Sequence, residues 1–391
     1  MTSDHPRRDA NPMSSDSLAL RRAEVAEKID RVRALLDAQG LSGALFTRQA
    51  TVGWITAGLE DVIIRNADPG FIWALILPHG AYLVTQNIEG RRVEAEEHPA
   101  DLGFELVQVP WHEEPFDSRV AALCDPARLV NDGFGPGRPL ARDLQRLRLA
   151  LTDGELARYE VLGADACAAL ESSVRTVDRG ISERELAARL VSELERRSIL
   201  PSVLLVGADD RHMRFRHPSV SDTSIQREVL TVIVGVRGGL HIAATRTVSL
   251  ERVGRTLLER HRAACAAEAH MIAATRPGAT YGQALQAGIE TYDQLGFADE
   301  WLHHYQGGPI GYGPREFGPA PVAHPNQFTD APVELHNACA WNPTVQGAKS
   351  EDTFLVETGG NRVITDSGAW PTIEIETPVG PIARPAILEL S

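Results

Sequence analysis

The chain has 391 residues, 43% of them hydrophobic, and a formal net charge of −14 at pH 7. This length allows two or three domains with sizeable cores. The acidic balance disfavours nucleic acid and anionic membranes as partners, because both bind clustered Lys and Arg. The 4 cysteines form no CxxC pair, which argues against a disulfide framework or zinc knuckle and predicts a reduced, cytoplasmic location.

The amino-terminal segment is polar and contains no apolar run of the kind found in a signal peptide. We therefore predict a flexible tail over residues 1–17. An amphipathic helix is expected from about Ser17 to Ala38, ending at Gly40. Its apolar residues recur at helical spacing: Ile29, Val32, Leu35 and Leu36.

Strand-like segments separated by turns follow this helix, at residues 43–47, 73–77 and 81–85. A segment rich in Gly and Pro, residues 133–140, then precedes a domain boundary near Leu149. The sequence thus predicts an amino-terminal α/β domain over residues 18–148 and a second domain over residues 149–391.

The second domain contains a weak internal repeat. A turn ending at Ser182 precedes the helical sequence ERELAARLVSELERRSI, and a similar turn ending at Thr280 precedes YGQALQAGIETYDQLGF. Strand-rich sequence follows each helix. The repeat predicts a duplicated unit of helices and sheet.

Three short motifs carry a family resemblance. The strand-like stretch from Val229 to Leu250 ends in Thr245-Arg246-Thr247, Gly307-Gly308 follows Gln306, and Glu351 begins a Glu-Asp-Thr segment. In this order they resemble the family of creatinase, prolidase, aminopeptidase P and methionine aminopeptidase. The resemblance extends over nearly the whole chain. It implies a mixed α/β (α+β) fold, with an amino-terminal mixed-sheet domain and a pseudo-symmetric "pita-bread" domain whose site lies between the halves of a curved sheet.

The metal-dependent members of that family hold two metal ions with carboxylates and a His. Those ligand positions correspond here to about Ile233, to Ala243, to Gly308, to Asn342 and to Glu351. Two divalent ions need several converging oxygen or imidazole ligands, including bridging carboxylates. We therefore predict that the dinuclear metal centre is lost and that the chain uses no metal and no cofactor.

Creatinase hydrolyses a C–N bond without metal, and the resemblance assigns its functional positions to residues of this chain. His217 corresponds to the acid/base His, since imidazole can accept and return a proton near pH 7. Arg315 corresponds to a carboxylate anchor, because a guanidinium binds carboxylate bidentately; an internal salt bridge to Glu316 or Glu351 is its alternative. Arg65 lies near a position that reaches the partner subunit's site, although a plain surface role is equally compatible.

Further residues receive smaller roles. Glu351 is expected to orient His217 or bind a cationic substrate group, but Thr245 replaces a second creatinase carboxylate, which argues for a substrate other than creatine. Additional substrate-binding candidates are His304, His241, Asn342 and Tyr312. A single metal bound by His241, His303 and His304 is a minor alternative, because no carboxylate or HxxxH spacing supports it.

We therefore predict a metal-independent hydrolase or lyase that cleaves a C–N bond in a small, carboxylate-bearing molecule, with His217 as general acid/base. Two alternatives stay open: a non-catalytic protein that binds a ligand or protein partner, and an Xaa-Pro peptidase with an atypical metal site. The family resemblance also implies a homodimer. Neither nucleic acid nor a membrane is expected as a partner.

Overall fold

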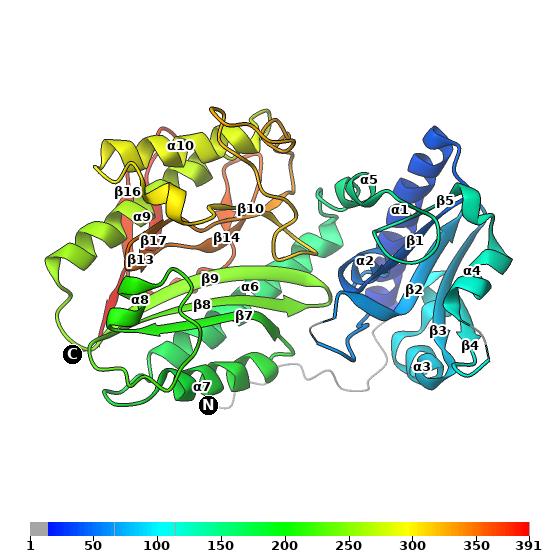
Figure 1. Cartoon of the computed structure of the whole chain (residues 1–391), viewed down its shortest axis with the longest axis horizontal. Coiled ribbons are helices and arrows are strands. Elements are labelled where there is room, and N and C mark those ends of the chain that lie inside the picture. Colours follow the sequence, from blue (N-terminus) through cyan, green and yellow to red (C-terminus); the bar gives the residue numbers. More distant parts are fainter. Residues whose placement is uncertain (1–14, 66, 114, 391) are drawn as a thin grey trace. The chain divides into compact units, whose positions relative to one another are not determined.

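The computed structural model describes residues 15–65, 67–113 and 115–390, and the chain divides into two compact units between Arg148 and Leu149 (Figure 1). The predicted tail lies outside the described residues except for residues 15–17, which already belong to the first helix, α1 (Ser15–Gln39). No helix in the described ranges is long and apolar enough to cross a membrane.

A mixed sheet of six strands organises the first unit, in the order β4-β3-β2-β1-β5-β6. Strands β1, β2 and β3 pair antiparallel, whereas β3–β4, β1–β5 and β5–β6 pair in parallel. The three predicted strands are confirmed, although β2 begins four residues earlier than expected. The elements are β1 (Gly43–Arg48), α2 (Gln49–Ile55), β2 (Pro69–Leu77), β3 (Gly80–Gln86), α3 (Asn87–Arg92), η1 (Val93–Glu97), η2 (Pro99–Leu102), β4 (Glu105–Val109), α4 (Phe116–Leu123), η3 (Pro126–Arg128), β5 (Leu129–Asn131), β6 (Arg138–Pro139) and α5 (Ala141–Arg146).

The second unit is built on an eight-stranded sheet whose main path is β10-β11-β14-β9-β8-β7. Strands β15 and β18 extend it by pairing with β14 and β9. Its elements are α6 (Asp153–Val174), α7 (Glu183–Glu195), β7 (Leu200–Ala208), α8 (Asp210–Arg214), β8 (Glu228–Arg237), β9 (Leu240–Ser249), α9 (Arg255–Ala274), α10 (Tyr281–Gln294), η4 (Glu300–His303), β10 (Gly307–Ile310), β11 (Ala338–Trp341), β12 (Thr344–Val345), β13 (Ala348–Lys349), β14 (Asp352–Leu355), β15 (Arg362–Val363), β16 (Thr372–Ile375), β17 (Ile382–Pro385) and β18 (Leu388–Glu389).

The predicted internal repeat corresponds to two halves of this unit. Helices α6 and α7 precede β7, β8 and β9, and helices α9 and α10 precede β10, β11 and β14. The second helix of each pair starts at a hydroxyl cap, where Ser182 accepts from the Glu185 N–H at 3.1 Å and Thr280 accepts from the Gln283 N–H at 3.2 Å. The halves meet where Ala244 of β9 pairs with Asp352 of β14.

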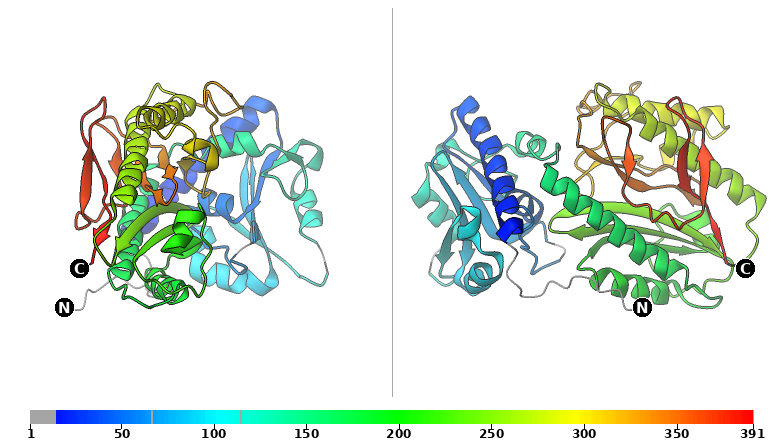
Figure 2. Two further views of the ribbon diagram at one scale, coloured as in Figure 1. Left: turned by 60° about the vertical axis from the view of Figure 1, so that its left-hand side comes forward. Right: turned by 180° about the vertical axis from the view of Figure 1, so that it is seen from behind.

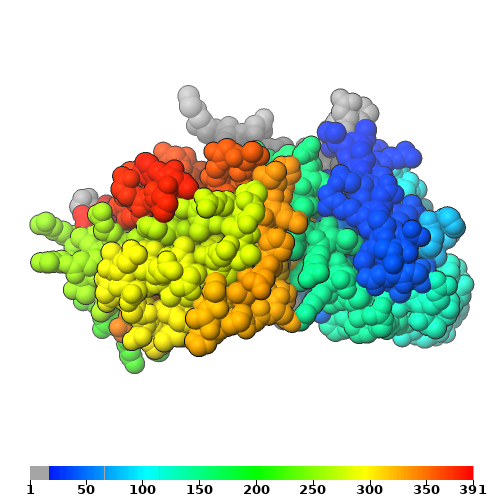
Figure 3. All heavy atoms as spheres, turned by 90° about the horizontal axis from the view of Figure 1, so that it is seen from above, coloured from blue at the N-terminus to red at the C-terminus, as the bar shows by residue number. Residues whose placement is uncertain are grey.

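The two helix pairs cover different parts of the sheet. Helix α6 packs on β8 and β9, and α7 packs on β7; seen from behind, α6 lies across these strands (Figure 2). Helix α9 packs against β11, β12 and β13. Together with α10 and the chain that follows it, α9 forms one face of the second unit (Figure 3). This duplicated arrangement confirms the predicted helix-plus-sheet architecture.

A buried network of charges holds β9, β14 and β17 together. Arg246 binds Glu171 at 3.0 Å and Asp352 at 2.9 Å, and Arg384 binds Glu268 at 2.9 Å and also contacts Asp352. All five side chains are at most 6% exposed. Each charge in the network has an opposite charge beside it, which is the condition for burying charges in a protein core. Two of these residues, Arg246 and Asp352, belong to the family motifs.

Candidate functional site

A cavity of about 390 Å³ lies within the second unit, bounded by strands β7, β8 and β9 and by residues of β10, β11 and β13. Four of the residues predicted to catalyse or to bind substrate line it: His217, Arg315, Asn342 and Glu351. They come from segments up to 134 residues apart (351 − 217), and the sheet brings them together. The site therefore combines side chains from both halves of the unit.

One wall of the cavity is apolar at the positions where the resemblance implies metal-binding carboxylates. Val232 and Val234 of β8 and Ala243 of β9 line it. Ile233, near which the family resemblance placed the first ligand position, is not among the lining residues. Neighbouring residues of a strand point to opposite faces of the sheet, so Val232 and Val234 are the residues of this segment that face the cavity.

Gly308 and Asn342, at two further ligand positions of the family, also contribute no charge to the cavity. Gly308 lines the cavity with a φ of +143°, a backbone conformation that L side chains rarely adopt. Asn342 lines it with a carboxamide whose buried Oδ1 atom has no hydrogen-bond partner in the described part of the chain. An unsatisfied buried polar atom carries a free-energy cost, so this atom is available to a ligand.

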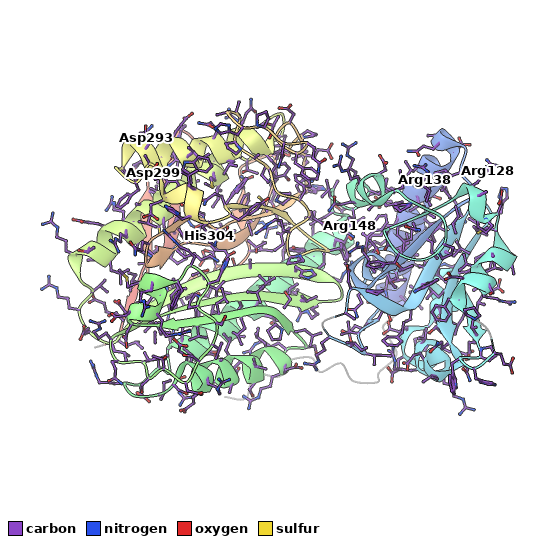
Figure 4. All side chains as sticks on the ribbon, viewed as in Figure 1. Arg128, Arg138, Arg148, Asp293, Asp299 and His304 are labelled. Carbon is purple, nitrogen blue, oxygen red and sulfur yellow. The ribbon has the colours of Figure 1, made fainter. Side chains whose placement is uncertain are left out.

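His217 and His304 form a direct imidazole pair. Their Nε2 atoms are 3.0 Å apart and their ring centroids 4.9 Å apart. His304 follows η4 and lies between that turn and strands β8 and β9 (Figure 4). Arg216 connects the two segments, because it donates to Thr344 at 3.0 Å and pairs with Glu300 of η4. The sequence predicted both histidines as site residues, but not their contact.

Both imidazoles are held in the neutral form. The pKa of His304 is lowered to about 2. Burial is the largest cause, and nearby positive charges, Lys349 first among them, contribute to the shift. The pKa of His217 is also lowered, by burial and then by Lys349 and Arg315, whereas Glu351 opposes the shift. A neutral His217 has a nitrogen lone pair and can accept a proton at neutral pH.

The tautomer of the pair decides which ring can act as the base. One Nε2 atom must donate to the other, so only one N–H lies between the rings. If His217 donates to His304, the Nδ1 atom of His217 keeps its lone pair. A basic role for His217 therefore requires this tautomer.

Glu351 and Lys349 form a buried ion pair inside the cavity. The Lys349 Nζ atom lies 2.9 Å from Glu351 Oε2, and both side chains are only 4% exposed. The Thr245 hydroxyl donates to the same carboxylate oxygen at 2.8 Å. The negative charge of Glu351 thus raises the pKa of His217, whereas the direct contacts of the Glu351 carboxylate are with Lys349 and Thr245. Lys349 was missed in the sequence, although it stands two residues before Glu351 on an extended segment, where side chains share a face.

Arg315 stands at the exposed edge of the cavity, stacked on an aromatic ring. Its guanidinium carbon is 3.7 Å from the centroid of the Tyr305 ring. In the described part of the chain Arg315 makes no ion pair with Glu316 or Glu351, the alternative considered from the sequence. The guanidinium N–H groups remain available to an anion, while the aromatic ring fixes the plane of the group.

The other sequence candidates, His304 included, are not among the residues that line this cavity. His241 bonds through Nδ1 to the carbonyl of Gly239 at 3.0 Å, and His303 lines a separate surface hollow beside η4. These positions contradict the suggestion that His241, His303 and His304 share one metal ion. Tyr312 is fully buried, and Arg65 is an exposed residue of the first unit.

The donor set of the cavity does not fit a pair of divalent ions. It offers one imidazole, His217, one carboxylate, which is already paired with an ammonium group, and one carboxamide. Across the described ranges, no group of three or more His, Cys, Asp and Glu could hold a metal ion. A buried ammonium beside the carboxylate would also repel a bound cation.

Comparison with solved structures identifies the fold. The Xaa-Pro dipeptidase from Bacillus anthracis matches with a TM-score of 0.71 and 20% identity, covering 94% of this chain and 100% of that one. The prolidase from Pyrococcus horikoshii OT3 matches with a TM-score of 0.72 and 16% identity, covering 87% and 98%. The N-terminal domain of FACT complex subunit SPT16 from Cicer arietinum (chickpea) matches with a TM-score of 0.64 and 10% identity, covering 90% and 97%.

These matches confirm the predicted pita-bread fold. A search of curated proteins finds no significant match. The sequence model of metallopeptidase family M24 matches residues 159–358, which is just over half of the 391 residues and contains every cavity residue discussed above. The chain therefore belongs to metallopeptidase family M24.

Proposed function

We propose that this protein hydrolyses a C–N bond in a small substrate that carries one carboxylate, and that it does so without a metal ion. The observation that carries the proposal is a neutral His217 that contacts His304 and lines a cavity whose charges are an ammonium, a guanidinium and one carboxylate. General acid/base chemistry requires a side chain that can accept and then return a proton, and His217 meets that requirement.

The charge of the cavity favours a monoanionic substrate. Lys349 and Arg315 contribute two positive charges and Glu351 one negative charge, so one positive charge remains when both imidazoles are neutral. A substrate carboxylate would neutralise it, and Arg315 offers the bidentate geometry that carboxylates prefer. The volume of about 390 Å³ suits a small molecule.

In the proposed reaction, His217 takes a proton from water while the water oxygen forms a bond to the carbon of the scissile C–N group. The C–N bond then breaks, and the proton on His217 passes to the departing nitrogen. The products are an acid and an amine, so atoms and charges balance. His304 stabilises the protonated His217 through their shared hydrogen bond, because its own lowered pKa keeps it a neutral acceptor.

The comparisons favour a second candidate, cleavage of Xaa-Pro dipeptides, since two of the matched structures are titled Xaa-Pro dipeptidase and prolidase. The cavity's donor set favours the metal-independent candidate instead. A non-catalytic binding role is the third possibility.

A substrate screen separates these candidates. The metal-free protein is incubated with N-acylglycines, N-carbamoyl amino acids, amidino acids and Xaa-Pro dipeptides, and the products are measured by mass spectrometry. We expect turnover of a carboxylate-bearing amide, urea or amidine that is lost in His217→Gln. Turnover of Xaa-Pro dipeptides only after manganese or cobalt is added supports the second candidate. No turnover of any compound rejects the proposal in favour of a binding role.

A further inference from the structure

The least expected side chain in the cavity is Lys349. It is a lysine whose side chain is 4% exposed, and it lies in a small strand between the Asn342 and Glu351 positions of the family motif. Lysine is among the residues that proteins bury least often, because removing an ammonium from water is costly. A buried lysine that lines a cavity therefore calls for a binding or catalytic explanation.

The contacts of Lys349 leave part of its hydrogen-bonding capacity unused. Within the described residues, its ion-pair partner is Glu351, at 2.9 Å. An ammonium group carries three N–H donors, so at least one more donor can serve a molecule in the cavity. Glu351 is held in turn by the hydroxyl and the backbone of Thr245, at 2.8 Å and 2.9 Å. The lysine is thus fixed in position before any substrate arrives.

The walls around Lys349 increase the effect of its charge. Val232, Val234 and Ala243 are buried apolar residues of the same cavity. Electrostatic interactions are stronger in such surroundings than in water, and a preorganised donor needs no reorganisation during the reaction. The influence of Lys349 on both imidazoles, whose pKa values it lowers, places its charge close to the acid/base pair.

We propose that Lys349 is a catalytic residue of the hydrolysis, donating a hydrogen bond to the oxygen of the scissile carbonyl group. This inference rests on the proposed function and extends it to the substrate class: an acyl or carbamoyl group attached to nitrogen, with a carboxylate within reach of Arg315. Glu351 is then a positioning residue for Lys349 and does not act as the base.

The role of Lys349 is electrostatic, so no bond to the lysine forms or breaks. When the water oxygen attacks the carbon, the carbonyl π electrons move to the oxygen, and the ammonium stabilises the resulting negative charge. When the C–N bond breaks, the oxygen returns that electron pair to carbon and the leaving nitrogen takes its proton from His217. In this chain the ammonium thus supplies the positive charge that a Lewis-acidic metal ion supplies elsewhere.

Two matched probes test this assignment by binding. N-acetylglycine carries a carboxylate and an amide carbonyl, and pentanoate has the same chain length and carboxylate but no amide carbonyl. Affinities are measured by isothermal titration calorimetry, with NMR confirming that N-acetylglycine stays intact. We expect Lys349→Met to weaken binding of N-acetylglycine by roughly ten- to hundredfold, the effect of a hydrogen bond to a charged group, with little change for pentanoate. Arg315→Met, in contrast, should weaken both probes to a similar extent.

The Lys349→Met variant leaves Glu351 buried without its partner and can lower stability for that reason alone. The double variant Lys349→Met with Glu351→Gln removes both charges and should show the same selective loss. Equal affinities of wild type and variants for both probes would show that Lys349 is only half of a structural ion pair. Equal weakening of both probes would make it a carboxylate anchor and overturn the assignment to the carbonyl.

The outcomes for Lys349 and for the proposed function are distinguishable. Selective loss of N-acetylglycine binding without turnover of any substrate supports the Lys349 contact and rejects hydrolysis. Failure of the wild-type protein to bind either probe rejects the substrate class, and with it both proposals. Where turnover is found, Lys349→Met should lower kcat/KM for the substrate and leave the Ki of a carboxylate-only competitive inhibitor unchanged, because that inhibitor has no amide carbonyl oxygen to accept a hydrogen bond from Lys349.

Discussion

Glu351 and Asp352 are neighbours in the sequence but belong to two very different regions of the second unit. Glu351 faces the cavity, where it contacts Lys349 and Thr245. Asp352 faces the opposite side and lies between Arg246 and Arg384. The network around Asp352 pairs every charge, whereas the cavity retains donors and acceptors without partners. Full pairing indicates a structural role, and incomplete pairing indicates a site prepared for a ligand.

This comparison also gives part of the family motifs a structural role that does not depend on binding a metal ion. Arg246 and Asp352 belong to the Thr-Arg-Thr and Glu-Asp-Thr motifs, and both lie in the buried network that joins the two halves of the sheet. Their replacement would leave buried charges unpaired. The motif residues that face the cavity carry no such constraint, so they can change with the chemistry.

The largest effect is expected on catalysis, when a residue that lines the cavity is replaced. His217→Gln should reduce kcat roughly 10²- to 10⁴-fold on the substrate found by screening, since that is the usual contribution of a general acid/base. Its melting temperature should stay close to that of the wild type. His212→Gln is the matched control, because His212 bonds to the Gly347 carbonyl at 2.8 Å and to Glu228 at 3.2 Å, outside the cavity lining. Full activity of His217→Gln would disprove its role as the base.

Substitutions in the buried charge network around Asp352 should instead lower the free energy of unfolding. Asp352→Asn should lower the free energy of unfolding by about 3–5 kcal/mol, because it leaves two buried guanidinium groups without their shared carboxylate. Glu351→Gln should cost less than Asp352→Asn, because the carboxamide oxygen of Gln can still accept hydrogen bonds from Lys349 and Thr245. Urea unfolding of both variants, followed by circular dichroism, measures the difference. Equal losses would remove the distinction between the two regions.

A pH effect on stability follows from His304. Its pKa is about 2 in the folded chain and 6.5 ordinarily, so below pH 6.5 the unfolded chain binds a proton that the folded chain excludes. The contribution of neutral His304 to the free energy of unfolding is present above pH 6.5 and is lost as the pH falls below that value. Between pH 8 and pH 5 the loss is about 2 kcal/mol for one such histidine.

His304→Gln isolates this contribution, because the variant has no imidazole to protonate at that position. The unfolding free energy of the variant should fall less between pH 8 and pH 5 than that of the wild type, as measured by urea unfolding at several pH values. Parallel curves for the two proteins would show that His304 is readily protonated in the folded state.

The smallest effect is expected at the cavity edge. Tyr305→Leu removes the ring beneath Arg315, a cation–π contact worth about 0.5–1 kcal/mol at an exposed site, and should weaken pentanoate binding roughly two- to fivefold. Tyr305→Phe keeps the ring and should bind like the wild type. If both variants bind equally well, the stacking does not orient Arg315.

Much of the fold was predictable from the sequence because its signals are local. Apolar spacing indicated α1, alternating strands with turns indicated β1 to β3, and the two capped turns at Ser182 and Thr280 indicated the repeated helices. The strand boundaries were less predictable: β2 extends to Pro69, where pairing with Arg48 of β1 continues the sheet. Such pairing depends on a distant segment and leaves no local pattern.

The candidate site was predictable only in part. The motif positions predicted His217, Arg315, Asn342 and Glu351 as site residues, and all four line one cavity. The Nε2 contact between His217 and His304 joins residues 87 positions apart, so no spacing in the sequence could reveal it. The sequence did not predict Lys349, because the family's ligand positions hold carboxylates and imidazoles, whereas the group beside Glu351 is an ammonium.

The central claim, hydrolysis without a metal ion, is tested most directly by metal analysis of protein purified without chelator, paired with activity before and after EDTA treatment. Our account predicts a metal content far below one ion per chain, unchanged turnover of the carboxylate-bearing substrate after EDTA, and no gain of Xaa-Pro dipeptide cleavage with manganese or cobalt. Stoichiometric metal, together with activity that disappears with EDTA and returns with the metal, would contradict it and establish an unrecognised ligand set.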